Sequence, residues 1–347
     1  MTRTLDFHFL VLRNGAIFDE LQPIKNATPL LYMNESSEIK TSLTGDFAEN
    51  SQVNWLTDQI RPEIEIDGIR HPLGIFLPAT VTPTEDENTK SVHLEAYDRC
   101  WLVRDNYTET IRHFSAGSNY VEIVRQLLTE CGIAVMLVTP STATLVEDRE
   151  DWNVGTSLLQ IVNDLLKEIN YNPLWFNAQG AAIVAPARAP SVENIQHTLD
   201  SSQVTSLMLP QIRQETDVYQ APNVFICIVS NADKSGPLVA TAENNNPQSP
   251  LSIPRRGRRI VSVQRLDNVA SQADLEAHAT KLRNESLFTG ETITVRTALL
   301  PGFGVDDITA LHYGEISALC VERAWSMELR VGGSMMHKLE RVVIALD

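Results

Sequence analysis

The stretch Pro62-Glu-Ile-Glu-Ile-Asp-Gly-Ile-Arg-His-Pro-Leu-Gly-Ile-Phe-Leu-Pro78 predicts two antiparallel strands joined by a tight turn. Ile64 and Ile66 alternate with acidic residues, so one face of the first strand is apolar and the other carries carboxylates. Asp67-Gly68 supplies what a type I′ turn requires, because both central residues of that turn have positive φ. The chain is then expected to return through Ile75-Phe-Leu77.

A third strand is predicted from Val92-His-Leu-Glu-Ala-Tyr-Asp-Arg99, in which Val92, Leu94 and Ala96 share one face. Together the three strands form a short signature of turn and strand-end residues. Its members are Asp67, Gly68, Gly74, Tyr97, Asp98 and Arg99.

The chain around this signature is rich in short strands separated by turn residues, from Leu5 to about Tyr107, which favours a small barrel or sandwich. A mixed segment follows. Asn119 is expected to cap a helix that Gly132 ends, a second helix is expected at about 154–169, and Pro173–Pro186 reads as a hairpin.

Strands return after about Thr198, interrupted by a helix that Ser271-Gln-Ala-Asp274 caps. The Asn-, Pro- and Arg-rich segment Ala242–Arg258 is expected to be a long mobile loop. The fold class is therefore mainly β with an α+β middle module, and two small β-barrels flank that module. The expected units are a first barrel at 1–110, an α+β domain at 111–197, and a second barrel at 198–347 with an inserted helix at 271–287.

The net charge of the chain is −16, from 28 basic and 44 acidic residues, which argues against a protein that grips nucleic acid along its whole surface. This excess of negative charge either keeps the protein soluble or lines a conduit through which a polyanion passes without binding.

The four cysteines are widely spaced in apolar settings and are expected to be reduced core thiols. No run of eighteen apolar residues and no signal-like N-terminus are present, so neither a membrane span nor a secretory signal is expected.

No nucleophile, phosphate-binding loop or metal-ligand spacing is found, so we expect no catalytic residue, no metal site and no cofactor. The eight histidines are isolated. The carboxylate pairs Glu63/Glu65 and Asp306/Asp307 would suit acid–base cleavage of a glycan only if a cleft brought two partners to within about 5 to 9 Å.

One basic cluster is present, formed by Arg255, Arg256, Arg258 and Arg259. It could hold phosphates, but the acidic remainder of the chain favours a contact with the acidic surface of a neighbouring subunit. These four arginines are the candidate interface residues.

The hairpin signature resembles the first β-barrel of phage tail hub proteins, a family that includes the barrel-bearing base of type VI secretion spikes. Three further stretches resemble the middle domain, the inserted helix and the final strand and turn of that family. They are Gly155–Pro186, Asp267–Leu275 and Gly290–Gly302.

The resemblance implies a structural hub of a phage tail baseplate, located in the virion tail and assembled in the host cytoplasm. It implies a homotrimeric ring that joins the hexameric tail tube, or a distal tail protein, to a central spike or tail-tip protein. It also implies contact with the tape measure protein and passage of DNA without specific binding. The excess of acidic residues, combined with this conduit role, predicts a net acidic lumen, and the composition predicts no membrane insertion of this chain. Two alternatives remain: a β-rich cell-wall glycan hydrolase acting in host entry, and a carbohydrate-binding β-module.

Overall fold

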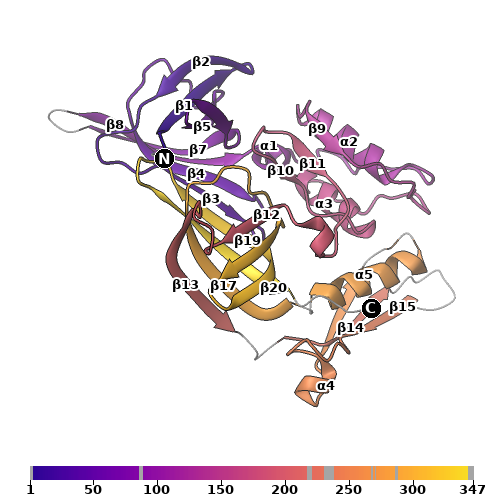
Figure 1. Ribbon diagram of the computed structural model, residues 1–347. Coiled ribbons are helices and arrows are strands. Elements are labelled where there is room, and N and C mark those ends of the chain that lie inside the picture. The colour runs from indigo at the N-terminus through magenta and orange to yellow at the C-terminus, as the bar shows by residue number, and fades with distance from the viewer. Residues whose placement is uncertain are drawn as a thin grey trace.

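The computed structural model describes residues 3–85, 89–216, 221–229, 238–266, 269, 271–285 and 288–342. The chain is mainly β, with a small α+β unit on one side and a second α+β unit set apart from the barrels (Figure 1). Within these residues, no helix is long and apolar enough to cross a lipid bilayer.

The first β region is a closed barrel with the strand order β4-β8-β7-β5-β1-β2. It closes where the chain after β2 meets β4: Pro23 bridges Phe47, and the amide of Ala48 donates to the carbonyl of Gln22 over 2.8 Å. Phe9 and Phe47 pack edge to face in its core, with ring centroids 5.0 Å apart. The strands are β1 (Leu5–Arg13), β2 (Ala16–Leu21), β4 (Thr41–Ala48), β5 (Gln59–Ile66), β7 (Phe76–Glu85) and β8 (Lys90–Asp98), with β6 (Ile69–Pro72) paired to β5.

The second β region surrounds its own core, formed by Leu199, Ile293, Val295, Leu311, Cys320 and Leu339. Parallel β12 and β18 form one side, and antiparallel β19, β20, β17 and β13 continue the sheet. The bounds are β12 (His197–Asp200), β13 (Met208–Thr216), β17 (Phe288–Ala298), β18 (Ile308–Tyr313), β19 (Ile316–Glu328) and β20 (Ser334–Val342).

The two β regions share one sheet, which the sequence does not predict. Strand β19 is 13 residues long; its first part pairs with β18, and its last part pairs with β3 (Leu30–Asn34) next to the first barrel. A bulge between Glu322 and Ala324 separates the two parts, as expected where a strand bends from one barrel to the next. Because this pairing crosses between the units expected at 1–110 and 198–347, those domain boundaries stay a prediction.

The middle unit has the helices and the hairpin that the sequence predicts. The Asn119 side chain accepts from the amides of Val121 and Glu122 and begins α2 (Tyr120–Glu130), and Gly132 follows with φ of 77°. Helix α3 (Leu158–Glu168) begins later than expected, because Ser157 is its N-cap. The remaining elements are α1 (Cys100–Asp105), β9 (Met136–Val138), β10 (Trp175–Phe176), β11 (Ala182–Val184) and the 3₁₀ helix η1 (Val192–Asn194).

The insertion is larger than the single helix expected at 271–287. The sequence predicts that this stretch belongs to the second barrel, but three of its strands form a separate sheet that α5 (Gln272–Glu285) covers. They are β14 (Val224–Val229), β15 (Leu238–Glu243) and β16 (Val261–Leu266). They separate because β14 and β16 pair in parallel, and Cys227, Ala240 and Leu275 give them a core of their own. Residues 286 and 287 of the expected helix lie outside the described residues.

The long loop expected at Ala242–Arg258 is also partly wrong. Strand β15 continues to Glu243, and α4 (Ile253–Arg256) forms inside the segment with Ser252 as its N-cap. Asn223 anchors this segment, since its side-chain amide donates to the carbonyls of Leu251 and Arg258. Buried side-chain hydrogen bonds thus give the segment a defined structure in spite of its polar composition.

Candidate functional site

The predicted turn at Asp67 and Gly68 is present between β5 and β6, with φ of 51° and 84°. Asp67 also ties the turn to the start of β1, because its Oδ1 accepts from the amide of Thr4 over 2.8 Å. The return path differs from the expectation. Strand β6 ends at Pro72, and Phe76 instead begins β7, which pairs with β5 only at Ile60.

Gly74 makes this change of direction possible. Its φ is 126°, and a Cβ atom there would lie 2.8 Å from the ring of Phe76. A larger residue would therefore meet both backbone strain and a clash with the barrel core. The signature glycines are structural residues of the first barrel.

Asp98 and Arg99 lie where the first barrel meets the middle unit. The buried Asp98 carboxylate accepts from the amide and hydroxyl of Thr41 and from the amide of Cys100, which begins α1. Burial raises the pKa of Asp98, although these hydrogen bonds oppose the rise. Arg99 donates from Nη2 to Gln59 Oε1 over 2.9 Å and from Nη1 to the carbonyl of Gly180 over 3.3 Å. The pair thus joins the end of β8 to the start of β4, to the start of β5 and to the hairpin of the middle unit.

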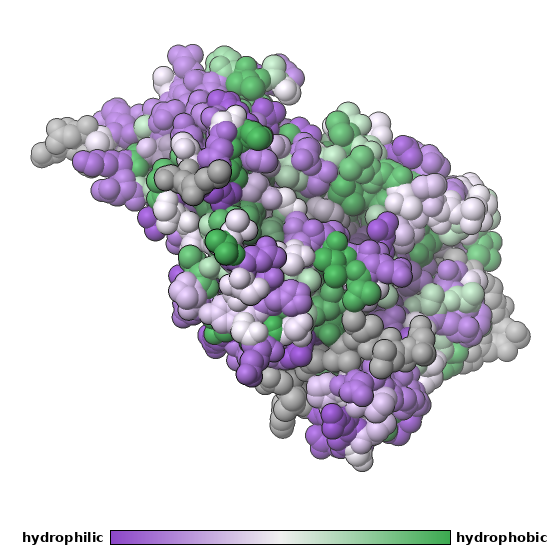
Figure 2. Space-filling view, viewed as in Figure 1, coloured by the Kyte–Doolittle hydropathy of each residue, from purple (hydrophilic) through white to green (hydrophobic). Residues whose placement is uncertain are grey.

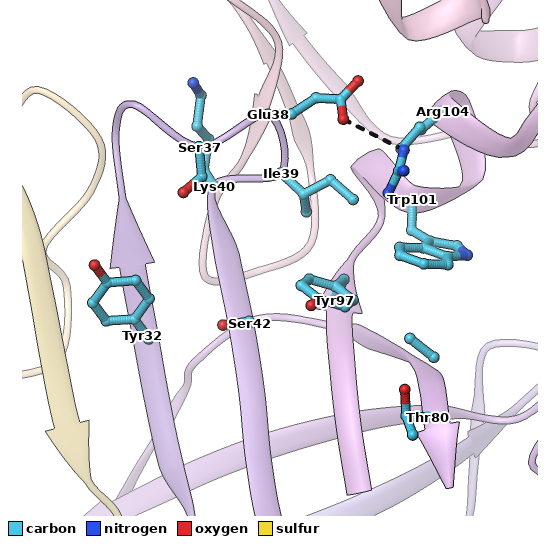
Figure 3. A pocket seen from close by; sticks show the side chains of 11 residues that line it. Tyr32, Ser37, Glu38, Ile39, Lys40, Ser42, Thr80, Tyr97, Trp101 and Arg104 are labelled. Carbon is cyan, nitrogen blue, oxygen red and sulfur yellow. Dashed lines mark ion pairs between the residues drawn. The ribbon is translucent and has the colours of Figure 1, made fainter.

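Tyr97 is on the outer side of the same strand, in a groove of about 520 Å³ between β3, β4 and α1 (Figure 3). Its ring stacks on Trp101, with centroids 5.1 Å apart, and Arg104 lies over Trp101 and pairs with Glu38 at 3.4 Å. Tyr32 lies across the groove on β3. Sequence reasoning placed Tyr97 in the signature but did not predict this groove.

The groove belongs to a broad face of the shared sheet. Directly paired residues have side chains on the same face. Tyr32 pairs with Ser42 on one side and with Ser326 on the other, so the outer face runs without interruption from one barrel to the next. We call it the outer sheet face. It is defined by the outward residues of β7, β8, β4, β3, β19, β20 and β17.

Hydroxyl groups are common on the outer sheet face, and its described charges are nearly balanced. Hydroxyl side chains are Thr80, Thr82, Ser91, Ser42, Thr44, Ser326, Thr292 and Thr294. Carboxylates are Asp46, Glu95, Glu328 and Glu340, and cations are Arg296, Lys338 and Arg323, of which Arg323 pairs with Glu340 at 2.7 Å. The side of the molecule in Figure 2 is mostly hydrophilic, including the arm formed by β7 and β8 and the region around α4.

The candidate interface arginines lie on and after α4. Arg255 and Arg258 are exposed, Arg256 donates to the carbonyl of Ala221, and Arg259 pairs with Glu243 at 2.6 Å. The structure therefore directs part of this cluster toward its own chain. Whether the cluster contacts another subunit stays a prediction.

The carboxylates that could suggest catalysis contact Arg or His side chains. Glu63 contacts Arg61 at 2.8 Å, Asp306 contacts Arg323 at 2.6 Å, and Asp307 contacts His197 at 2.9 Å. Among the described residues, no group of three or more His, Cys, Asp or Glu side chains could hold a metal ion. All four cysteines are buried and unpaired.

No protein-family model matches this chain, and no curated protein matches it. Solved structures do match. The tail protein from Neisseria meningitidis MC58 aligns over 96% of this chain and 96% of its own length, at 12% identity and a TM-score of 0.68. The 43 kDa tail protein of prophage MuSo2 from Shewanella oneidensis aligns over 96% and 98%, at 11% identity and a TM-score of 0.64.

A third match is the E. coli c3393 protein, a component of the type VI secretion system, which covers 100% of this chain and 78% of its own, at 7% identity and a TM-score of 0.52. These alignments span both barrels, the middle unit and the insertion, and they confirm the predicted resemblance at the level of the fold. The chain therefore has the fold that phage tail proteins share with a component of the type VI secretion system.

Proposed function

We propose that this chain is a structural hub of a phage tail baseplate, in which three copies form a ring between the tail tube and the central spike or tail tip. The observation that carries the proposal is the shared sheet. Two barrels of one chain are joined edge to edge through β3 and β19, so each copy offers two similar units side by side. Three such chains present six similar units, which matches a hexameric tube on one side and a trimeric spike on the other.

The outer sheet face is the surface proposed to line the DNA conduit. It is continuous across both barrels, and it carries many hydroxyls and three described cations against four carboxylates. Affinity for DNA comes chiefly from Lys and Arg contacts to phosphates, so a face of this composition lets a duplex pass without holding it. The proposed partners are the tube or distal tail protein, the spike or tail-tip protein and the tape measure protein.

The role proposed for the chain is mechanical. Its fold is that of tail proteins, and the carboxylate pairs that could suggest glycan cleavage are engaged with Arg61, Arg323 and His197. Zymography on host cell walls provides the check. Clearance that disappears on a single Glu→Gln or Asp→Asn change would replace this role with the hydrolase alternative.

The deciding experiment is a reconstruction of the assembled particle at side-chain resolution. We expect three copies around the central axis, with the outer sheet face toward the lumen. One or six copies per ring, or a lumen formed by the middle unit, would contradict the proposal. The assembled particle is the sample of choice, because we expect the ring to form on the tube or the spike.

A further inference from the structure

The insertion contains a sheet with only one face covered. Helix α5 packs on the face formed by Cys227, Val229 and Ala240. In Figure 1, α5 lies between this sheet and the middle unit, and Asn170 of the middle unit donates to the carbonyl of Asp274 on α5 over 3.2 Å. The opposite face of the sheet therefore points away from the middle unit of its own chain.

This opposite face, which we call the open sheet face, is largely apolar, and Glu243 at its edge is paired with Arg259. The register of β14 with its neighbours places Ile226 beside Val263, and Ile228 beside Val239. The exposed fractions are 47% for Val239, 50% for Val261 and 51% for Val263. Contiguous exposed apolar surface of this kind marks a contact site.

Basic side chains border the open sheet face. Arg265 follows Val263 on the same side of β16, and Arg258 is exposed just before that strand. Residues 221–285 contain eight Lys and Arg and six Asp and Glu, which gives them a net charge of +2. The net charge of the whole chain is −16, so the remaining residues together carry −18. The insertion is thus opposite in charge to the body of its own chain.

The middle unit has a surface that complements this face. Its segments 107–118 and 144–155 run side by side, joined by backbone hydrogen bonds between Phe114 and Arg149. Ile111, Val146 and Val154 are 56%, 58% and 61% exposed on them. The same segments bear exposed carboxylates at Glu109, Glu147, Asp148 and Glu150. We call this surface the acidic loop pair.

We propose that the open sheet face of one copy docks on the acidic loop pair of the neighbouring copy and holds the ring together outside the barrels. The occupant is a second copy of this chain, because that chain presents apolar side chains with carboxylates to match the apolar side chains and arginines of the insertion. The proposal rests on the proposed ring, and it adds to it a specific contact between copies. Charge complementarity sets the register, and apolar burial supplies the adhesion.

The first test places charge on the open sheet face. Val261→Glu combined with Val263→Glu should lower the number of complete rings in assembled tails by about tenfold or more, because carboxylates would be buried against carboxylates. The control is Val204→Glu, at a fully exposed valine away from this face, which should assemble like the wild type. The isolated chains should melt at the same temperature, because all three valines are exposed.

The second test is a charge exchange. Arg258→Glu with Arg265→Glu should reduce ring formation, and adding Glu147→Lys with Glu150→Lys in the same chain should restore it, because each contact between copies would again join opposite charges. The readout is the number of copies per tail, determined by quantitative mass spectrometry and by particle reconstruction.

Three results would overturn the inference. The valine double variant could form rings as often as the wild type, the exchange could fail to rescue, or rings could form normally while the tube or spike fails to attach. The last result would assign the open sheet face to another tail protein. Each leaves the proposed function standing, whereas wild-type particles without three copies would refute that function directly.

Discussion

Glu322 and His337 contact each other inside the second β region, with 2.8 Å between Oε2 and Nδ1 and neither side chain exposed. His337 also lies 3.1 Å from the Thr297 hydroxyl through Nε2, and the ring of Phe303 packs against it. Glu322 Oε1 has no hydrogen-bond partner among the described residues. Burial raises the pKa of Glu322, and His337 opposes that rise.

The first prediction follows from this pair. His337→Leu should cost about 3 to 5 kcal/mol of unfolding free energy, because it leaves a buried carboxylate without its partner. Adding Glu322→Met should recover most of that loss, since the charge that needs a partner is then gone. Urea denaturation of the three variants completes the cycle. A double variant as unstable as His337→Leu alone would show that packing, rather than the carboxylate, causes the loss.

The second prediction concerns the turn at Gly68. No atom lies within 4 Å of a Cβ built there, so any cost of substitution comes from the positive φ alone. Gly68→Val should destabilise the first barrel by about 1 to 3 kcal/mol, and tail assembly should suffer before secondary structure does. Gly68→Asn is the control and should cost less, because Asn tolerates this conformation. Equal melting temperatures for Val and Asn would contradict the assignment.

The third prediction tests Arg99 as the joint between the first barrel and the middle unit. Arg99→Lys removes the guanidinium group, whose two terminal nitrogens donate to Gln59 and to the carbonyl of Gly180. The change should lower the free energy of unfolding by about 1 to 3 kcal/mol. Hydrogen exchange should quicken in the hairpin at 173–186. Arg104→Lys is the matched control, since the exposed pair of Arg104 with Glu38 is worth less than about 1 kcal/mol. Unchanged hydrogen exchange at 173–186 in the Arg99 variant would show that Arg99 does not hold the first barrel to the middle unit.

The fourth prediction is a pH dependence of the insertion. His278 on α5 is buried, with Nε2 3.1 Å from Gln264 Oε1. Burial, assisted by Lys167 and Lys281, lowers its pKa from 6.5 to about 4. The unfolded state therefore takes up a proton at a higher pH than the folded state, and stability present above pH 6.5 is lost as the pH falls toward 4.

His278→Gln should flatten this dependence, because Gln can keep the contact with Gln264 and does not titrate. Protection of the 272–285 amides, measured by hydrogen exchange at several pH values, gives the profile. His312→Gln, at an exposed histidine on β18, is the control and should keep the wild-type profile. A profile that stays steep in the His278 variant would assign the loss to other groups.

The fifth prediction concerns the proposed conduit. Changing Asp46, Glu95 and Glu328 to Lys turns the described charges of the outer sheet face from four carboxylates against three cations into one against six. Tails should assemble normally but deliver DNA more slowly, because the new lysines would contact the phosphates of the DNA. Charges are screened beyond about 8 Å at physiological salt, so only side chains on the lumen wall itself should have this effect.

The control changes three exposed carboxylates away from that face, at Asp105, Glu193 and Glu315, to Lys. It adds the same charge to the chain and should leave the ejection rate at the wild-type value. Normal ejection by the outer-face variant, measured by DNA release from purified particles, would remove the electrostatic part of the proposal and leave its architecture intact.

The sequence alone was sufficient where a feature depends on neighbours in the chain. The turn at Asp67-Gly68 follows from two residues that accept positive φ, and the start of α2 follows from an Asn side chain two and three residues before the amides it caps. The alternation in Val92–Arg99 likewise predicted that Val92, Leu94 and Ala96 share one face, and all three are buried in β8. These are local relations, so the printed sequence contains their physical cause.

Only the tertiary structure decided how the strands combine. Met33 pairs with Trp325, nearly 300 residues later, and the outer sheet face exists only because of that pairing. The two-residue alternation in β3 and β19 indicates which face of each strand is apolar. It does not determine the partner strand, because many strands share the same pattern. The insertion forms a unit separate from the second barrel for a similar reason. The parallel pairing of β14 with β16 and the packing of α5 bury a core of their own, and these contacts join segments that are distant in the sequence.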